Sequence, residues 1–284
     1  MQNKDNSIPG ISITDVTFLH DIKVTRVEVK TTEAAEVLGK PIGNYITLEF
    51  PQSIDTQEIC DTLTSALTDE LRGVMGLKDS DSVLVVGIGN RDILADSFGP
   101  RTVEQVEVTA HLIEHGLCET RKVSAICPGV MGQTGIETFR IIQSVVKEVK
   151  PDCVIVVDAL CSKDLSRLAT TIQIADTGIS PGAGLGTAHT KIDRESLGVP
   201  VYAIGVPMVV EVANIIADGF GALDGIPIST IFGEAELDEI IRHKMKDIPN
   251  GDAALALKDC DDVVATLSAV VANAINTALL GGFK

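Results

Sequence analysis

Residues 83–100 read VLVVGIGNRDILADSFGP, a run of apolar, strand-forming residues that ends in a glycine-containing turn. The turn begins like a dinucleotide-binding loop, with Gly87 and Gly89, but Asp92 stands where that motif requires its third glycine. The run therefore predicts a buried strand of a parallel sheet. The loop after it is not predicted to bind a nucleotide.

Apolar runs and helical patterns alternate along the rest of the chain. The other runs typical of strands are VSAIC at 123–127, CVIVVDAL at 153–160, TTIQIAD at 170–176 and VPVYAIGV at 199–206. Apolar residues recur with helical spacing at 100–115, 136–149, 209–217 and 234–246. Continuous apolar strands joined by helices are typical of a mostly parallel sheet covered by helices on both faces. The predicted fold class is therefore α/β.

The first eighty residues follow another pattern. IKVTRVEVK at 22–30 and YITLEF at 45–50 alternate apolar and polar residues, which predicts strands of a small sheet with one face in water. A helix is predicted from about Thr56 to Met75. We expect one α/β domain over 1–284, in which residues 1–80 are an N-terminal β and helix embellishment of a core over 83–284.

Composition excludes several classes of protein. Of the 284 residues, 45% are hydrophobic, enough for a large core, and the net charge of −17 repels nucleic-acid phosphates. The start, MQNKDNSIPG, has no apolar segment typical of a signal peptide, so a cytoplasmic protein is expected. The six cysteines form no CxxC pair, which favours reduced thiols over disulfides or a metal site. No cofactor is predicted.

One stretch has the length of a membrane span. Residues 263–283 carry no charge, but they are rich in alanine and include polar residues such as Asn273 and Asn276. Asp261 and Asp262 come just before it and suit the N-terminus of a helix in a soluble protein. We therefore expect a terminal helix packed into the core or a subunit interface, and no membrane partner.

Two aspartates follow predicted strands at the carboxyl edge of the sheet, where ligands of open α/β sheets bind. Asp96 lies in the loop after the first strand, just before Pro100, and Asp158 ends the charge-free run CVIVVD. Two acids that meet over an apolar floor cannot both ionise cheaply, so they are expected to share a proton and activate water. The alternative is that Asp96 caps a helix and Asp158 binds loop amides.

Other candidate residues have weaker patterns. Asp176 belongs to an Asp-Thr-Gly tripeptide also found in pepsin-like proteases, which are all-β, so a structural role in its loop is favoured. SPGAGLG at 180–186, with Gly182 and Gly184, is a candidate flap or substrate wall. His111 and His115 do not form the HExxH pattern, and His189 is the histidine that best fits a metal ligand.

Long blocks of the sequence resemble the germination protease family of spore-forming bacteria. These blocks are GNYITLEF at 43–50, VLVVGIGN at 83–90, DSFGP at 96–100, VSAICPGVMGQTGIET at 123–138, KPDCVIVVDAL at 150–160, TTIQIADTGISPGAGLG at 170–186 and SLGVPVYAIGVPMVV at 196–210. The most distinctive of them is PGVMGQTGIET. The resemblance covers most of the chain.

The resemblance implies an endopeptidase that cuts small acid-soluble spore proteins during germination. It implies an atypical aspartic mechanism on a fold similar to the hydrogenase maturation proteases, with Asp96 and Asp158 as the two essential aspartates, and a homotetramer. It also implies a zymogen, but the RTDLA-like segment of the family is not found here, so processing stays open. The chain departs from the family pattern at Ala95, Ala110, Met208 and Glu211.

The combined interpretation assigns roles to the loops as well. Gly87, Gly89 and Asn90 are expected to shape the loop that aims Asp96. Lining of the cleft is expected from Gly129, Gly132, Thr134, Gly182 and Gly184, whose backbone N–H groups would face a peptide. Two rival functions stay open: a metal-dependent peptidase that uses the same acids with a histidine, and a non-enzymatic sporulation protein that retains the scaffold.

Overall fold

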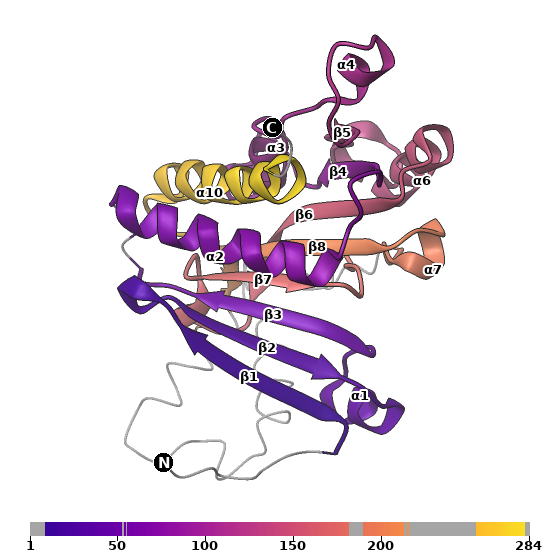
Figure 1. The fold of residues 1–284 in the computed structure, drawn as a ribbon. Coiled ribbons are helices and arrows are strands. Elements are labelled where there is room, and N and C mark those ends of the chain that lie inside the picture. Colours follow the sequence, from indigo (N-terminus) through magenta and orange to yellow (C-terminus); the bar gives the residue numbers. More distant parts are fainter. Residues whose placement is uncertain are drawn as a thin grey trace, which may run out of the picture.

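The architecture is a single mixed sheet with helices on both faces (Figure 1). The computed structural model describes residues 9–52, 54, 56–181, 190–212, 215 and 254–281. Within them the strand order is β1-β2-β3-β7-β8-β6-β4-β5, and β9 pairs with β8. The strands are β1 (Ile11–Thr17), β2 (Lys23–Val29), β3 (Gly43–Glu49), β4 (Val83–Gly87), β5 (Val123–Ile126), β6 (Cys153–Ser162), β7 (Thr171–Ala175), β8 (Val201–Glu211) and β9 (Ala254–Leu255).

The predicted parallel arrangement holds for half of this sheet. Strands β5, β4, β6 and β8 are parallel neighbours. The other pairs are antiparallel: β7 with β8, β3 with β7, β2 with β3, and β1 with β2. Parallel neighbours need a long crossover, and the connection between β6 and β7, residues 163–170, is too short for one. Strand β7 therefore runs back across the sheet.

The N-terminal strands do not form a separate small sheet. Strand β3 pairs with β7, with Thr47 opposite Gln173, so β1, β2 and β3 extend the core sheet at one edge. The expectation of a small separate sheet was therefore wrong, although the predicted alternation is present: Val24, Ile46 and Leu48 are buried while their neighbours are partly exposed.

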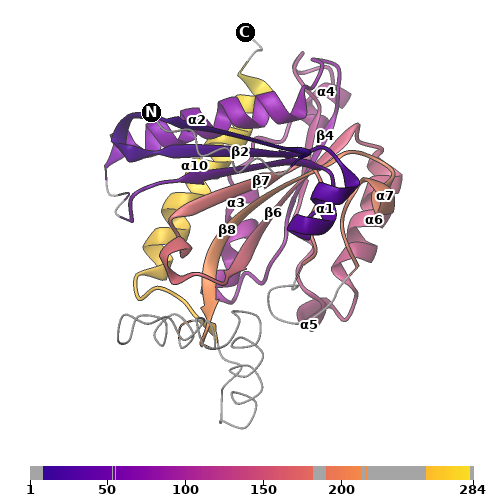
Figure 2. The same ribbon diagram turned by 90° about the horizontal axis from the view of Figure 1, so that it is seen from below.

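Two helical layers cover the sheet (Figure 2). Helices α2 (Gln57–Met75), α3 (Phe98–Val103) and α10 (Cys260–Leu280) pack on one face, in a cluster that includes Leu67 and Val271. Helices α6 (Thr138–Val149) and α7 (Arg194–Leu197) accompany the other face, where a second cluster contains Ile142 and Val156. The shorter helices are α1 (Thr32–Leu38), α4 (Ala110–Glu114) and α5 (Met131–Thr134).

Two of the predicted helices, over 56–75 and 136–149, match the structure. Helix α2 begins after Thr56, whose side chain accepts a hydrogen bond from the N–H of Ile59, and ends at Gly76 in the left-handed region. The predicted helix over 100–115 was wrong, because α3 ends at Val103 and α4 begins at Ala110. In the segment between these two helices, the N–H of Glu107 donates to the Asn276 side chain of α10 at 2.9 Å. This bond ties the non-helical segment to α10.

Helix α10 packs as predicted into the protein core. It is long and apolar enough to span a membrane, and half of its most apolar window is buried. Val264, Leu267 and Val271 are fully buried in the cluster shared with α2. Of the other predicted helices, the segment from residue 209 begins within β8, which runs to Glu211, and 234–246 lies outside the described residues.

Candidate active site

Asp158 lies inside strand β6, at the step where β4 ends. Gly87, the last residue of β4, pairs with Val157, so Asp158 is the first residue of β6 beyond its shorter neighbour. Strand β6, predicted over 153–160, continues beside β8 to Ser162, so Asp158 lies within it. Asp158 is 6% exposed, so its carboxyl group is buried within the protein.

Asp96 lies in η2 (Leu94–Ser97), a single 3-10 turn between β4 and α3. Its backbone carbonyl contacts the position where a side chain on Gly89 would begin, and Gly89 has a φ of 133°. Gly87 in the same way allows the backbone of Gly99 to approach β4. Only glycine fits such close crossings, so these residues hold the Asp96 turn against the end of β4.

The charge of Asp96 acts on the carboxyl group of Asp158. Burial raises the pKa of Asp158 well above the ordinary value of an aspartate, and the negative charge of Asp96 raises it further. Burial also raises the pKa of Asp96, but the N–H of Asn90 opposes this by donating to its Oδ2 at 2.6 Å. The pair is therefore suited to hold one proton, with Asp158 the more strongly protonated member.

Gln133 supports the Asp96 loop, a contact that the sequence did not reveal. Its Nε2 donates to Oδ1 of Asn90 at 2.5 Å and to Oδ2 of Asp92 at 3.3 Å. The same Oδ1 accepts the N–H of Asp92 at 2.9 Å. The block PGVMGQTGIET thus contributes through the side chain of Gln133. Its position within this block was the signal available in the sequence.

The other residues predicted in this block have local roles. Gly129 has a φ of 72° and lies beside Gln133, while the Cβ position of Gly132 faces open space. The Thr134 hydroxyl donates to the carbonyls of Val130 and Ile136 and so closes its own turn.

Asp176 is held away from the acid pair. Its carboxylate accepts the backbone N–H of Asn44 at 2.8 Å and the Nδ2 of Asn44 at 2.7 Å, which joins β3 to the end of β7. Since β7 runs antiparallel to β8, this end lies toward the start of β6 and β8, whereas Asp158 lies level with Gly205. The structural role favoured by the sequence matches these contacts.

The remaining predicted residues are two glycines of the 180–186 loop and three histidines. Gly182, Gly184 and His189 lie outside the described residues. His111 and His115 belong to α4 and its end, where Nδ1 of His115 lies 2.7 Å from the His111 carbonyl. Within the described part of the chain, no three His, Cys, Asp or Glu side chains gather closely enough to hold a metal ion.

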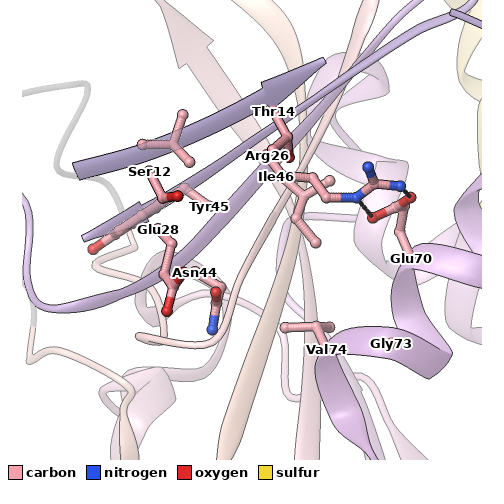
Figure 3. A pocket seen from close by; sticks show the side chains of 11 residues that line it. Ser12, Thr14, Arg26, Glu28, Asn44, Tyr45, Ile46, Glu70, Gly73 and Val74 are labelled. Atoms are coloured by element: carbon pink, nitrogen blue, oxygen red, sulfur yellow. Dashed lines mark hydrogen bonds and ion pairs between the residues drawn. The ribbon is translucent and has the colours of Figure 1, made fainter. Parts of the chain in front are cut away.

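A polar hollow of about 340 Å³ lies elsewhere, between β1–β3 and α2 (Figure 3). Arg26 on β2 forms a two-bond ion pair with Glu70 on α2, with Nε donating at 2.7 Å, and Glu70 is 6% exposed. This pair raises the pKa of Arg26. Because Arg26 lies on β2 and Glu70 on α2, this ion pair links α2 to the sheet.

The chain is similar to known proteins over most of its length. A family model described as germination protease matches residues 1–224. A germination protease of Clostridium perfringens is 38% identical over 97% of this chain and 90% of its own length. That of Caldanaerobacter subterraneus subsp. tengcongensis is 46% identical over 76% of this chain and 68% of its own. The germination protease of Priestia megaterium is 40% identical over 76% of this chain and 60% of its own length.

Among solved structures, the [NiFe] hydrogenase maturation protease HycI of Thermococcus kodakarensis is similar to 74% of this chain. It is 17% identical, with 98% of its own chain covered and a TM-score of 0.38. The match to the family model extends over more than half of the chain, through both aspartates. The chain belongs to the germination protease family and is a peptidase.

Proposed function

We propose that this peptidase is an endopeptidase of the atypical aspartic type, in which Asp96 and Asp158 activate one water molecule. Its proposed substrates are the small acid-soluble proteins of the spore core, and by resemblance to its family it is expected to be a homotetramer. The observation that carries the mechanism is the raised pKa of Asp158, caused by burial and by the charge of Asp96. Such a pair retains one proton where ordinary aspartates have lost theirs.

The different surroundings of Asp96 and Asp158 indicate which one is the general base and which the general acid. Asp96 accepts an N–H bond from Asn90, which favours its ionised form, so Asp96 is the general base. Asp158 is buried and faces the charge of Asp96, so it keeps the proton and is the general acid. A base and an acid that differ in this way can work together at one pH.

The reaction then proceeds in two steps. Asp96 takes a proton from water as the water oxygen bonds to the peptide carbonyl carbon, and Asp158 gives its proton to the carbonyl oxygen. The tetrahedral intermediate collapses when the C–N bond breaks: the leaving nitrogen takes the proton from Asp96, and the hydroxyl returns its proton to Asp158. Both carboxyl groups end in their starting states.

The test is digestion of a purified small acid-soluble spore protein by the full chain. Asp96→Asn and Asp158→Asn are each expected to lower kcat at least about 100-fold, since either change removes a partner in proton transfer. Asp79→Asn is the matched control, because it makes the same change at an exposed position in the connector before β4. Near-normal turnover by either site variant would refute the mechanism.

Two further arms separate the rival functions. Loss of activity on strong chelation, restored by a divalent metal, would indicate the metal-dependent peptidase. Absence of any cleavage by the folded wild-type chain would support the non-enzymatic alternative. Defined cuts that persist in the chelator support the aspartic mechanism.

A further inference from the structure

The loop that carries Asp96 closes on itself through Asn90. The N–H of Asn90 donates to Oδ2 of Asp96 at 2.6 Å, and the carbonyl of Asn90 accepts the N–H of Ile93 at 3.1 Å. The carbonyl of Ile93 in turn accepts the N–H of Asp96 at 2.9 Å. The direction of the Asn90 N–H and the position of the Asp96 carboxylate therefore depend on one another.

The side chain of Asn90 fixes the backbone at the start of this loop. Its Oδ1 accepts the N–H of Asp92 at 2.9 Å, which forms an Asx turn. The same oxygen accepts a hydrogen bond from Nε2 of Gln133 at 2.5 Å. Because two donors from different segments hold this oxygen, the Asn90 side chain cannot rotate without the loss of both bonds.

Gln133 connects the loop with a separate element. Helix α5 lies beyond the carboxyl ends of the parallel strands (Figure 2), and its Gln133 also donates to Oδ2 of Asp92 at 3.3 Å. Among the hydrogen bonds and ion pairs of the described residues, one other reaches 90–93 from another segment, the ion pair of Arg91 with Glu104. Both side chains of that pair are exposed, and it does not involve Asn90. Gln133 therefore supplies the tether that reaches the Asn90 turn.

The amide of Gln133 is oriented by its own helix. Its Oε1 accepts the N–H of Val130 at 3.4 Å at the start of α5, so Nε2 is directed toward Asn90. An ionised glutamate offers acceptors and no donor, and a methionine offers no N–H donor. The position therefore suits an amide, which accepts within α5 and donates to the loop.

Helix α5 is itself held at both ends. Gly129 and Gly135 flank it with φ of 72° and 70°, in the left-handed region that favours glycine. The N–H of Gly135 donates to the Met131 carbonyl at 2.8 Å. The hydroxyl of Thr138 donates to the Gly129 carbonyl at 3.1 Å. These closed turns give Gln133 a fixed position from which to contact the loop.

The Asn90 N–H acts directly on the charge of Asp96. Burial raises the pKa of Asp96, and the bond from the Asn90 N–H lowers it. A general base must be ionised to accept a proton from water. If the N–H were no longer aimed at the carboxylate, Asp96 would retain its proton to higher pH, and activity would be lost at a higher pH as the solution is acidified.

Other ionisable groups surround the Asp96 turn, which packs against β6, β8, α3 and α10. The charged side chains on these elements are Asp158, Glu211, Arg101, Asp261 and Asp262, and the loop itself adds Arg91 and Asp92. The cysteines and the tyrosine on these elements ordinarily titrate in alkali. Helix α5 carries no charged side chain, so replacement of Gln133 by a neutral residue leaves all of these charges in place.

We propose that Gln133 is a positioning residue for peptide cleavage: through Asn90 it holds in place the N–H that keeps Asp96 ready to accept a proton from water. The inference rests on the proposed function, in which Asp96 is the general base. It adds a residue outside the acid pair that sets the pH range of the reaction.

The test is the pH dependence of kcat/KM for a small acid-soluble spore protein, measured with the full chain. Gln133→Met keeps the length of the side chain without its amide. The acid limb of the profile is expected to move to higher pH by about half a unit to one unit, which lowers kcat/KM on that limb roughly 3- to 10-fold. KM should change little, because Gln133 acts on the base and not on the substrate.

A double-mutant cycle tests the route through Asn90. Asn90→Ala removes the Oδ1 acceptor and keeps the backbone N–H. In that background Gln133→Met should shift the acid limb little further, because residues that act through one contact are not additive. Gln57→Met is the matched control, since Gln57 is an exposed glutamine of α2 that donates to Asp61 at 2.8 Å. Its profile should equal that of the wild-type chain.

The outcomes separate this proposal from the one on which it rests. No cleavage by a folded wild-type chain would overturn both. Cleavage that requires Asp96 and Asp158, with an acid limb unchanged in Gln133→Met, would overturn the role of Gln133 alone. Equal shifts caused by Gln133→Met with and without Asn90→Ala would do the same, as would a loss that falls on KM at every pH.

Discussion

At the scale of single residues, the site depends on the carboxyl group of Asp158, whose burial makes its charged form unfavourable. Asp158 is enclosed by the sheet and faces the charge of Asp96. A raised pKa in the folded state lowers stability once pH rises above the pKa of an unfolded aspartate, because the unfolded chain releases the proton more readily. The catalytic pair is thus expected to cost the protein stability at neutral pH.

Asp158→Asn should therefore stabilise the folded chain at neutral pH. The gain should be absent in acid, where the carboxyl group is protonated in both states. It should grow as pH rises from the ordinary aspartate pKa through the raised one. Each kcal/mol of relief raises Tm by roughly 2–4 °C in a chain of this size. Thermal unfolding across a pH series measures the effect.

Asp152→Asn is the control of opposite sign. Asp152 accepts bonds from the N–H of Ser82 at 2.7 Å and from its hydroxyl at 2.8 Å, and these bonds lower its pKa. Its contribution to stability is present at neutral pH and lost as pH falls through the lowered pKa. A destabilised Asp158→Asn chain at neutral pH would contradict the account of the acid pair.

Sequence patterns could identify Asp96 and Asp158 as candidates because Asp96 lies in the loop after one apolar run and Asp158 ends another. They could not identify Gln133, whose contact with Asn90 spans 43 positions and depends on how α5 folds back over the loop.

At the scale of elements, the site depends on how closely α3 approaches β4 and β6. Gly99 on α3 leaves no space for a side chain, since an added Cβ would contact the Ile88 carbonyl and lie 2.6 Å from the carbonyl of Val157. Both neighbours are backbone atoms, which cannot move aside as a flexible side chain does. The helix and its preceding turn, which carries Asp96, would have to shift.

Gly99→Ala is accordingly expected to destabilise the chain by about 1–3 kcal/mol and to lower activity by displacing Asp96. Gly73→Ala is the matched control: Gly73 lies inside α2 with no atom within 4 Å of an added Cβ. It should gain about 0.5–1 kcal/mol from improved helix propensity. Urea unfolding measures both changes, and equal effects would show that the approach of α3 is not tight.

Helix prediction succeeded where the local signals were complete. Helix α2 has a cap at Thr56, a regular apolar face and Gly76 at its end. The segment 100–115 has helical spacing, but its backbone breaks where Glu107 binds Asn276 of α10, 169 positions away. A tertiary hydrogen bond there outweighs a local preference.

At the scale of the whole molecule, Arg121 ties the C-terminal helix to the sheet. Its side chain is 5% exposed and donates to the Leu279 carbonyl at 3.1 Å, and to those of Lys78 and Asp81 at 2.5 and 2.9 Å. These acceptors belong to the end of α10 and to the connector before β4. One guanidinium therefore joins three distant segments, and its charge suits the C-terminus of a helix.

Arg121→Met is expected to reduce the free energy of unfolding by about 2–5 kcal/mol, because bonds from a buried charged donor are lost and their acceptors stay buried. The control is Arg101→Met. Arg101 pairs with Asp261 at 2.7 Å between partly exposed side chains, and such pairs contribute about 0–1 kcal/mol. Urea unfolding compares the two, and equal losses would contradict a clamping role for Arg121.

The sequence by itself determined the class of fold, the apolar strands, the packed C-terminal helix and two candidate acids, because these follow from local hydrophobic patterns and from distinctive blocks. Tertiary structure alone decided that β1–β3 extend the core sheet, that Asp158 lies in its strand beyond the end of β4, and that Gln133 contacts the loop that carries Asp96. The reason is physical: strand neighbours and side-chain contacts between distant segments arise from the packing of the whole chain, which no local pattern encodes.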